Sequence, residues 1–218
     1  MLAYRSALTI LKALTLLLLP VISGCFGTQI YPVLEERVIS LRAGDLESAG
    51  LAFITPSSVT GQEEEKQAVA LIFAEVARLE RPKIRVVPLA ETLGAVNKAN
   101  LADAYKRMYE DSRDTGLFNR DMLQKISAAT GARYIAQLKL QQFIQGEKGR
   151  FGIFGLRIVE TRFAAIRLFF QIWDGQDGTI AWEGIQEMQY STDTVKENPV
   201  TFRTVIERTA RDLTARLP

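Results

Sequence analysis

The sequence predicts a single α/β domain whose β-sheet is mixed, with a parallel start and an antiparallel hairpin near the end, flanked by helices. Two observations carry this prediction. In the first half, two short apolar runs enclose a stretch with helical periodicity, which is typical of a strand–helix–strand unit. In the second half, two segments that alternate between apolar and polar residues enclose a glycine-containing turn, which is typical of a β-hairpin. Hydrophobic residues make up 47% of the chain, which is enough for a core.

The strand–helix–strand unit begins at the predicted strand Leu51–Ile54 and ends at the predicted strand Ile84–Val87. Thr60 and Glu63 form a capping box, in which the hydroxyl accepts from the third helical N–H and the carboxylate reaches back to the N–H of Thr60. A helix then runs to about Glu80. Its apolar residues fall on one face: Val69, Ile72, Phe73, Val76 and Leu79. Strands connected in this way pair in parallel through a right-handed crossover.

Helical periodicity continues from Glu91 to Thr130, where the sequence predicts three short helices. Asn100 and Asn119 are predicted to cap the second and third of these helices, because an asparagine side chain accepts from the free N–H groups of the first turn. Gly131 is predicted to end the third helix in a left-handed conformation.

The second half predicts an antiparallel sheet and a closing helix. Tyr134–Ile144 and Thr161–Trp173 alternate between apolar and polar residues, as half-buried strands do. The glycines of Asp174–Gly178 supply the positive φ that a tight turn needs, and a return strand follows from Thr179 to about Tyr190. Asn198–Pro199 then starts a closing helix, with a capping residue followed by proline at the first helical position.

The amino-acid composition excludes several kinds of active site. The chain has no histidine, so Ser-His-Asp catalysis, histidine-ligated zinc and imidazole proton transfer are excluded. No metal and no other cofactor are predicted. The net charge of +2 equals the charge of Arg5 and Lys12, so the chain after these residues is neutral. Nucleic acid is therefore not an expected partner, because it would require a net basic face.

The first 24 residues have the three parts of a secretory signal peptide: basic side chains, an apolar run over Ala13–Ile22 that is too short to span a bilayer, and small residues at the cut. The tetrad Ile22-Ser23-Gly24-Cys25 resembles a lipobox, the site where a bacterial lipoprotein precursor is cleaved and acylated. The resemblance implies cleavage between Gly24 and Cys25 and a lipid anchor on Cys25, which is the only cysteine.

Acylation at Cys25 would make membrane lipid the first partner of the chain. Each buried methylene adds about 0.8 kcal/mol, and a lipoprotein is expected to carry more than one acyl chain. Phe26 rather than aspartate follows the cysteine, which favours the periplasmic face of the outer membrane under the enterobacterial sorting rule. Residues 25–50, punctuated by Pro32 and Gly44, are predicted to form a tether between the anchor and an α/β domain at residues 51–218.

The predicted order of elements resembles the periplasmic domain shared by the TolB amino-terminal family and the CsgG-type curli-secretion lipoproteins. The resemblance also rests on short stretches at Leu51–Pro56, Ala132–Ile135, Leu168–Asp174 and Gly178–Trp182. It spans about 51–217 and marks a fold more than an activity. It implies a role in envelope assembly, secretion or docking rather than in catalysis, and no catalytic residues are carried over.

Glycines recur at every third position from Gly146 to Gly155, in a stretch that matches no phosphate-binding loop. The apolar residues of this stretch form a candidate partner or membrane loop: Phe151, Ile153, Phe154 and Leu156. Two interpretations remain open. The stretch is either a flexible connection whose aromatic rings fold onto the sheet, or an apolar loop that docks on a partner or a bilayer, since exposed apolar patches mark contact sites.

Three functions follow from these features. The first is an outer-membrane lipoprotein that acts as a non-catalytic binding or scaffold component of an envelope assembly or export system, with envelope proteins or further copies of the chain as partners. The second is a pore-forming secretion subunit of the CsgG type. Such pores take two long hairpins from each subunit, and only Gln142–Arg162 offers one here. The third is a histidine-independent hydrolase with paired carboxylates, for which the sequence shows no pair.

Overall fold

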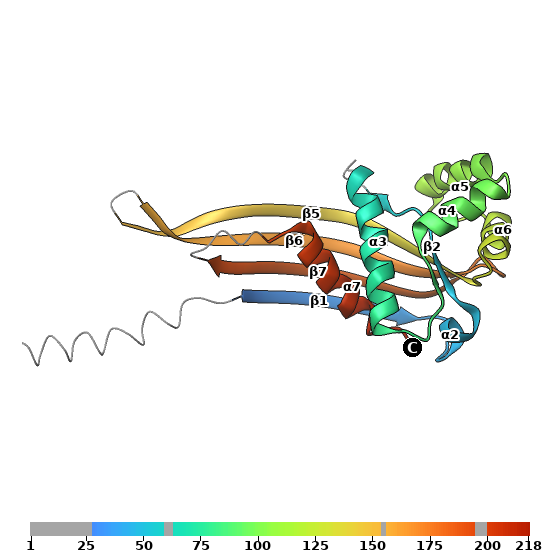
Figure 1. Ribbon diagram of the computed structural model, residues 1–218, viewed down its shortest axis with the longest axis horizontal. Coiled ribbons are helices and arrows are strands. Elements are labelled where there is room, and N and C mark those ends of the chain that lie inside the picture. Colours follow the sequence, from blue (N-terminus) through green and yellow to red (C-terminus); the bar gives the residue numbers. More distant parts are fainter. Residues whose placement is uncertain (1–27, 59–62, 154–155, 195–199) are drawn as a thin grey trace, which may run out of the picture.

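The structure, a computed structural model, describes residues 28–58, 63–153, 156–194 and 200–218 (Figure 1). Its elements follow in the order β1 (Thr28–Val38), α2 (Asp45–Ala49), β2 (Leu51–Phe53), β3 (Ser57–Ser58), α3 (Glu63–Glu80), β4 (Val86–Val87), α4 (Leu89–Lys98), α5 (Ala102–Thr115), α6 (Arg120–Thr130), β5 (Tyr134–Ile153), β6 (Leu156–Asp174), β7 (Ile180–Thr194) and α7 (Phe202–Thr214). The predicted single α/β domain with a mixed sheet and flanking helices is confirmed. Among the described residues, no helix has both the length and the apolar character needed to cross a membrane.

The strands form one sheet in the order β1-β7-β6-β5-β2-β4, with β3 beside β5. β2 pairs in parallel with β4, as the strand–helix–strand pattern predicted, and also with β5. The pairs β5–β6, β6–β7 and β7–β1 are antiparallel. The sheet is therefore parallel on one side of β5 and antiparallel on the other.

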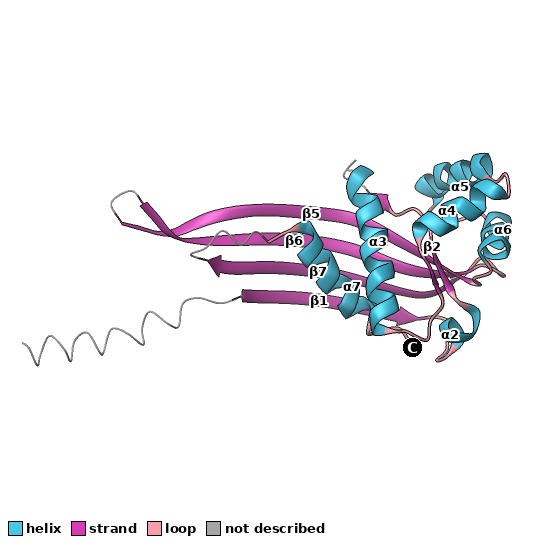
Figure 2. Ribbon diagram, in the orientation of Figure 1, coloured by secondary structure: helices cyan, strands magenta, loops and turns pink. Residues whose placement is uncertain are grey.

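Two helices, α3 and α7, cross one face of this sheet (Figure 2). Their apolar faces meet the inward side chains of the sheet in the main core, where Phe73, Phe170 and Trp182 are fully buried. Phe73 and Trp182 each meet the ring of Phe170 edge-on, at 5.5 and 5.3 Å between ring centroids. The two helices are also joined at the surface, where Arg203 of α7 contacts Glu75 of α3 at 2.8 Å.

The helices α4, α5 and α6 pack on the opposite face, at one end of the sheet only. Ile135 and Trp173 point to these helices because side chains alternate along each strand, so their neighbours Tyr134 and Ile172 lie in the main core. This second core includes Leu123 of α6. The molecule therefore has three layers at this end of the sheet, whereas the strands extend beyond them at the other end (Figure 1).

The helix ends follow the predicted chemistry in part. Asn119 caps α6 by accepting from the N–H of Met122 at 3.2 Å, and Gly131 ends that helix with φ 69°, so both predictions are confirmed. The prediction that Asn100 caps α5 is wrong, because Leu101 is at the cap and Asn100 adopts φ 55° in the turn before it. Thr60 and Asn198–Pro199 lie outside the described residues. Thr201 caps α7.

The described part of the predicted tether belongs to the folded domain. Residues 28–38 form β1, which pairs with β7 along its whole length, and residues 45–49 form α2. Ile30 and Leu34 pack against the main core from this strand. The physical reason is that β7 offers a free edge next to a partly covered apolar surface, which a strand of matching length can cover.

Candidate functional site

β5 and β6 form a hairpin that pairs from Tyr134 opposite Asp174 to Ile153 opposite Leu156. Its strands have 20 and 19 residues, whereas strands of globular proteins usually have about 5–6. The hairpin runs well past α3 and α7 (Figure 1). β2 and β3 pair with β5 only as far as Leu140, so β5 is an edge strand beyond that residue in the described part of the sheet.

A β-bulge at Gln141 changes which face the following residues of β5 occupy. The register between β5 and β6 skips one residue there. Leu140 is buried in the main core, and Phe143 lies on the same side, where its ring meets that of Phe202 edge-on at 4.9 Å. Ile144 therefore points to the opposite face, and it is 47% exposed.

Gly146 and Phe163 are directly opposite each other on β5 and β6. A Cβ atom at Gly146 would lie 2.7 Å from Cζ of Phe163, so the aromatic ring covers the glycine. An aromatic side chain over a cross-strand glycine makes up for the contacts that the missing side chain cannot make. At least this glycine of the three-residue repeat therefore has a packing role in the hairpin.

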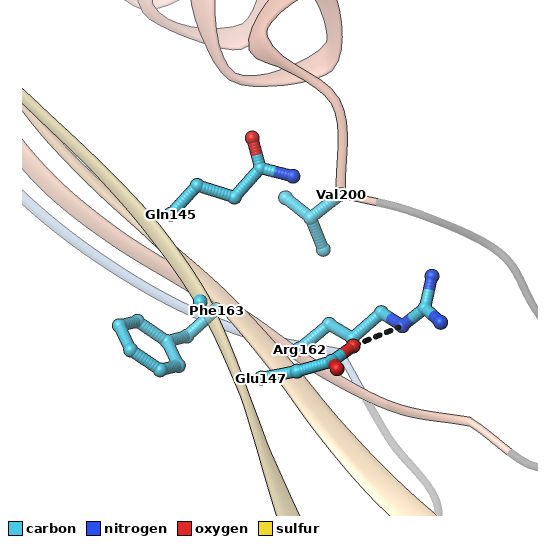
Figure 3. Close-up of a pocket in the computed structure, with 6 residues that line it drawn as sticks. Gln145, Glu147, Arg162, Phe163 and Val200 are labelled. Carbon is cyan, nitrogen blue, oxygen red and sulfur yellow. Dashed lines mark ion pairs between the residues drawn. The ribbon is translucent and has the colours of Figure 1, made fainter.

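A shallow cavity of about 370 Å³ lies between the hairpin and the chain that enters α7. Gln145 and Val200 point toward one another across it, and Glu147 contacts Arg162 with 3.8 Å between Oε2 and Nε (Figure 3). Six residues line the cavity: Gln145, Gly146, Glu147, Arg162, Phe163 and Val200. Glu147 is the only carboxylate among them, so this lining does not supply the pair of carboxylates that the hydrolase hypothesis requires.

No group of three or more His, Cys, Asp or Glu side chains in the described chain could hold a metal ion.

A polar cluster after β2 joins two tyrosines of α5 to the backbone of Thr55. The Tyr105 hydroxyl accepts from the N–H of Thr55 at 2.9 Å, and the Tyr109 hydroxyl donates to the Thr55 carbonyl at 2.7 Å. Burial raises the pKa of Tyr109 well above its ordinary value. Its hydroxyl therefore stays protonated and keeps its hydrogen bond to the Thr55 carbonyl.

The sheet face opposite α3 and α7 carries charged and aromatic side chains along the extended strands. The Nε atom of Arg167 lies 3.0 Å from Glu187 on the next strand, and its guanidinium lies 5.7 Å from the ring of Phe169. Phe169 and Ile185 are opposite each other and half-buried. Charged and aromatic side chains thus lie side by side on this face of the extended strands.

The start of β1 lies level with the outer part of the hairpin. Thr28 is opposite Thr192 of β7, Thr192 is opposite Arg162 of β6, and Arg162 is opposite Glu147 of β5. The beginning of β1 and the hairpin tip are at the same end of the molecule in Figure 1. Cys25 precedes Thr28 by three residues, which can span at most about 11 Å.

The structure places three of the predicted loop residues in strands. Phe151 and Ile153 belong to β5 and Leu156 to β6, on either side of the hairpin turn. Gly24, Cys25 and Phe154 lie outside the described residues. The hairpin connection is thus much shorter than the glycine spacing predicted, because strand pairing continues to Ile153 opposite Leu156.

The sequence prediction missed the exposed side chains of β1, where Tyr31 and Val33 are 61% and 58% exposed. A signal was present, since residues 28–38 are rich in β-branched, aromatic and other apolar residues. Pro32 interrupts this run, and a proline within such a run is typical of an edge strand.

No protein-family model matches the sequence, and none of the curated proteins with which it was compared matches it. Solved structures similar to this chain include the PelC dodecamer from Paraburkholderia phytofirmans, with 12% identity over 86% of this chain and 94% of that chain and a TM-score of 0.43. Lipoprotein GNA1162 from Neisseria meningitidis is 12% identical over 77% of this chain and 98% of that chain, with a TM-score of 0.39.

The LpoB C-terminal domain from Salmonella enterica is 16% identical over 65% of this chain and 91% of that chain, with a TM-score of 0.34. The neighbours thus include a bacterial lipoprotein and a protein solved as a dodecamer. The expected likeness to the TolB amino-terminal and CsgG-type families is not shown by these comparisons.

Proposed function

We propose that this chain is a lipid-anchored lipoprotein on the periplasmic face of the bacterial outer membrane, where it acts as a non-catalytic binding or scaffold domain for an envelope assembly or export system. One observation supports this proposal above the others. Thr28 begins β1 in the same row as Glu147 of the hairpin, so an acylated Cys25 lies close to the hairpin end of the sheet.

An anchor at this end orients the whole domain. Since the three residues from Cys25 to Thr28 span at most about 11 Å, a lipid on Cys25 would turn the strand extension toward the bilayer and α4, α5 and α6 toward the periplasm. The residues predicted as a partner or membrane loop, Phe151, Ile153, Phe154 and Leu156, are the contacts that we propose with lipid or with a membrane-bound partner.

Replacement of the cysteine tests the anchor. Wild-type chain grown with an alkyne-bearing palmitate should carry the label and float with membranes, whereas Cys25→Ala should lose the label and move to the soluble periplasmic fraction. Ser23→Ala serves as the matched control, because small residues are accepted at that position. Recovery of Cys25→Ala in the membrane fraction in wild-type amount would contradict the proposed anchor.

Shortening the hairpin tests the docking role. Replacement of residues 149–155 by a two-residue turn should leave membrane fractionation unchanged and remove crosslinks to envelope proteins in living cells, identified by mass spectrometry. Leu117→Ser on the far end of the molecule, where Leu117 is 65% exposed, is the control. Unchanged crosslinks in the shortened variant would assign docking to another surface.

A second candidate function is a pore-forming subunit of the CsgG type. The length of the hairpin favours it, because strands of 20 and 19 residues exceed the ~9–11 residues that a transmembrane strand requires. Conductance of the purified chain in planar bilayers separates the two functions. A scaffold produces no stable channels, whereas stepwise conductance that disappears in the shortened hairpin variant would replace the scaffold by the pore.

A further inference from the structure

Two strands of the sheet have an unpaired outer edge over the same part of its length. Among the described residues, β1 pairs only with β7, and β5 beyond Gln141 pairs only with β6. The register places both edges at one height, because Val33 is opposite Glu187, Glu187 is opposite Arg167, and Arg167 is opposite Gln142. Each edge presents backbone N–H and C=O groups that another strand can pair with.

Part of each edge lacks the charged side chains with which proteins usually protect exposed strands. Residues 28–33 of β1 and residues 141–146 of β5 contain no charged side chain, and the charges of β1 begin at Glu35. Pro32 has no N–H and removes at most one donor from the β1 edge. Uncharged edge segments rich in strand-forming residues are the ones that add to another chain.

Exposed apolar side chains also gather on these two strands. Tyr31, Val33 and Val38 on β1 are 61%, 58% and 54% exposed, and Ile144 on β5 is 47% exposed. In the described parts of the two inner strands, β6 and β7, no large hydrophobic side chain is comparably exposed. The apolar surface is thus placed where a neighbouring strand would cover it.

The strand directions allow the two edges to pair with each other. β5, β6, β7 and β1 alternate in direction, so β1 of a second copy placed beside β5 runs antiparallel to it. Ile144, Ala165, Gln189 and Tyr31 form one row across these four strands. Partners in a row share a face of the sheet, so the row ends in an exposed apolar side chain at each edge.

We propose that copies of this chain associate head to tail, with residues 29–33 of β1 in one copy paired antiparallel to residues 142–146 of β5 in the next, the part of β5 that β2 and β3 leave free. The sheet then continues from copy to copy, and Tyr31 of one copy meets Ile144 of its neighbour. The two copies contribute different surfaces, so the interface is heterologous and builds a ring or a filament. This association goes beyond the anchoring role proposed above and does not depend on it.

Paired cysteines in the full-length chain test the interface. Within one copy, Tyr31 and Ile144 are separated by three strand spacings of about 4.8 Å each, roughly 14 Å, and a disulfide requires Cα atoms within about 7 Å. Oxidation of membranes that contain Tyr31→Cys with Ile144→Cys should therefore give a reducible ladder of dimers, trimers and larger species. Gln29→Cys and Val33→Cys, each with Ile144→Cys, cover a shift of two residues along the strand, which keeps the same face.

The single-cysteine variants make the test directional. Tyr31→Cys alone and Ile144→Cys alone should give no species above the wild-type background, because each edge meets a different edge. If all three double variants remain monomeric, the proposed pairing is wrong. If Tyr31→Cys alone crosslinks as strongly as the double variant, β1 pairs with another β1 across a two-fold axis, and the head-to-tail interface is wrong.

A charge at the edge gives an independent readout. Ile144→Lys should reduce the mass in mild detergent from that of an oligomer to that of a monomer, with melting temperature and membrane fractionation unchanged. Leu71→Lys is the matched control, since Leu71 on α3 is 51% exposed and lies away from both edges. A wild-type chain that is itself monomeric, or an Ile144→Lys chain that keeps the oligomeric mass, would overturn the proposal, whereas the anchor is judged separately by fractionation.

Discussion

Thr28 and Thr192 place their hydroxyl oxygens 3.3 Å apart at the outer end of the β1–β7 pair. This contact joins the first described residue of the chain to the end of β7, across a sequence separation of 164 residues. Cross-strand threonine pairs stabilise a sheet modestly. The contact also places β1 within the sheet. The side chains of β1 that face the core should therefore contribute more to stability than the exposed side chains that alternate with them.

Leu34 and Val33 test this alternation on β1. Leu34 packs against the main core, whereas Val33 is 58% exposed. Leu34→Ala should lower the free energy of unfolding by about 1–2 kcal/mol, less than for a fully buried leucine, and Val33→Ala by under about 0.5 kcal/mol. Urea unfolding of both variants measures this difference. Equal, negligible effects would mean that residues 28–38 behave as a tether in solution.

Arg133, the residue before β5, is joined to Asp174 at the end of β6. Nη2 of Arg133 donates to Oδ2 of Asp174 at 2.6 Å, and the Asp174 side chain is only 5% exposed. Arg133→Ala leaves this carboxylate buried without its cation, which should cost about 2–3 kcal/mol after allowance for the partial exposure of the arginine.

Arg113 provides the control for that variant. It contacts Asp114 at 3.7 Å with both side chains exposed, so Arg113→Ala should change the free energy of unfolding by less than about 0.5 kcal/mol. Chemical denaturation compares the two variants directly. If Arg133→Ala is as mild as Arg113→Ala, the buried carboxylate is satisfied by other groups.

Gly146 and Phe163 should behave as a coupled pair. Gly146→Ala places a methyl group where the Phe163 ring lies, so the ring must move, at a cost of about 1 kcal/mol. Phe163→Ala removes that obstacle, and the double variant should be more stable than the sum of the single changes predicts. A double-mutant cycle by thermal unfolding measures the coupling. Strict additivity would mean that the ring does not cover the glycine.

Asp177 and Thr179 predict a pH-dependent contribution to stability. The Thr179 hydroxyl, at 2.6 Å, and then its N–H, at 2.9 Å, lower the pKa of Asp177. Because the folded-state pKa lies below the unfolded value of about 3.9, this carboxylate stabilises the fold above about pH 4, and the contribution disappears as the pH falls through the lowered pKa.

Thr179→Val should therefore lower the melting temperature at pH 7 and have less effect below about pH 3, where the carboxylate is protonated in both chains. Thermal unfolding across this range checks the prediction. Asp177→Asn with Thr179→Val controls for the loss of the hydroxyl, since the pH dependence should then vanish. A difference between Thr179→Val and wild type that stays constant with pH would assign the effect to packing.

Much of the fold could be predicted because its signals are local. The Asn119 cap, the left-handed Gly131 and the turn at Asp174–Gly178 each depend on side chains within a few residues of one another. The apolar character of the candidate hairpin residues is visible in the sequence, but their glycine-rich surroundings predict a loop. The error arose because glycines that usually break strands are tolerated here, with the Phe163 ring lying over Gly146.

The sequence by itself determined the order of the main strands and helices from β2 onward, the mixed sheet, the absence of histidine chemistry and the expectation of an anchor at Cys25, since all of these depend on composition or on short-range patterns. Only the tertiary structure decided that residues 28–38 join the sheet, that β5 and β6 continue past the helices, and that Tyr31 and Ile144 end one row at opposite edges. The physical reason is that strand pairing joins residues far apart in the chain. The residues next to a strand in the sequence therefore do not determine which strand it pairs with.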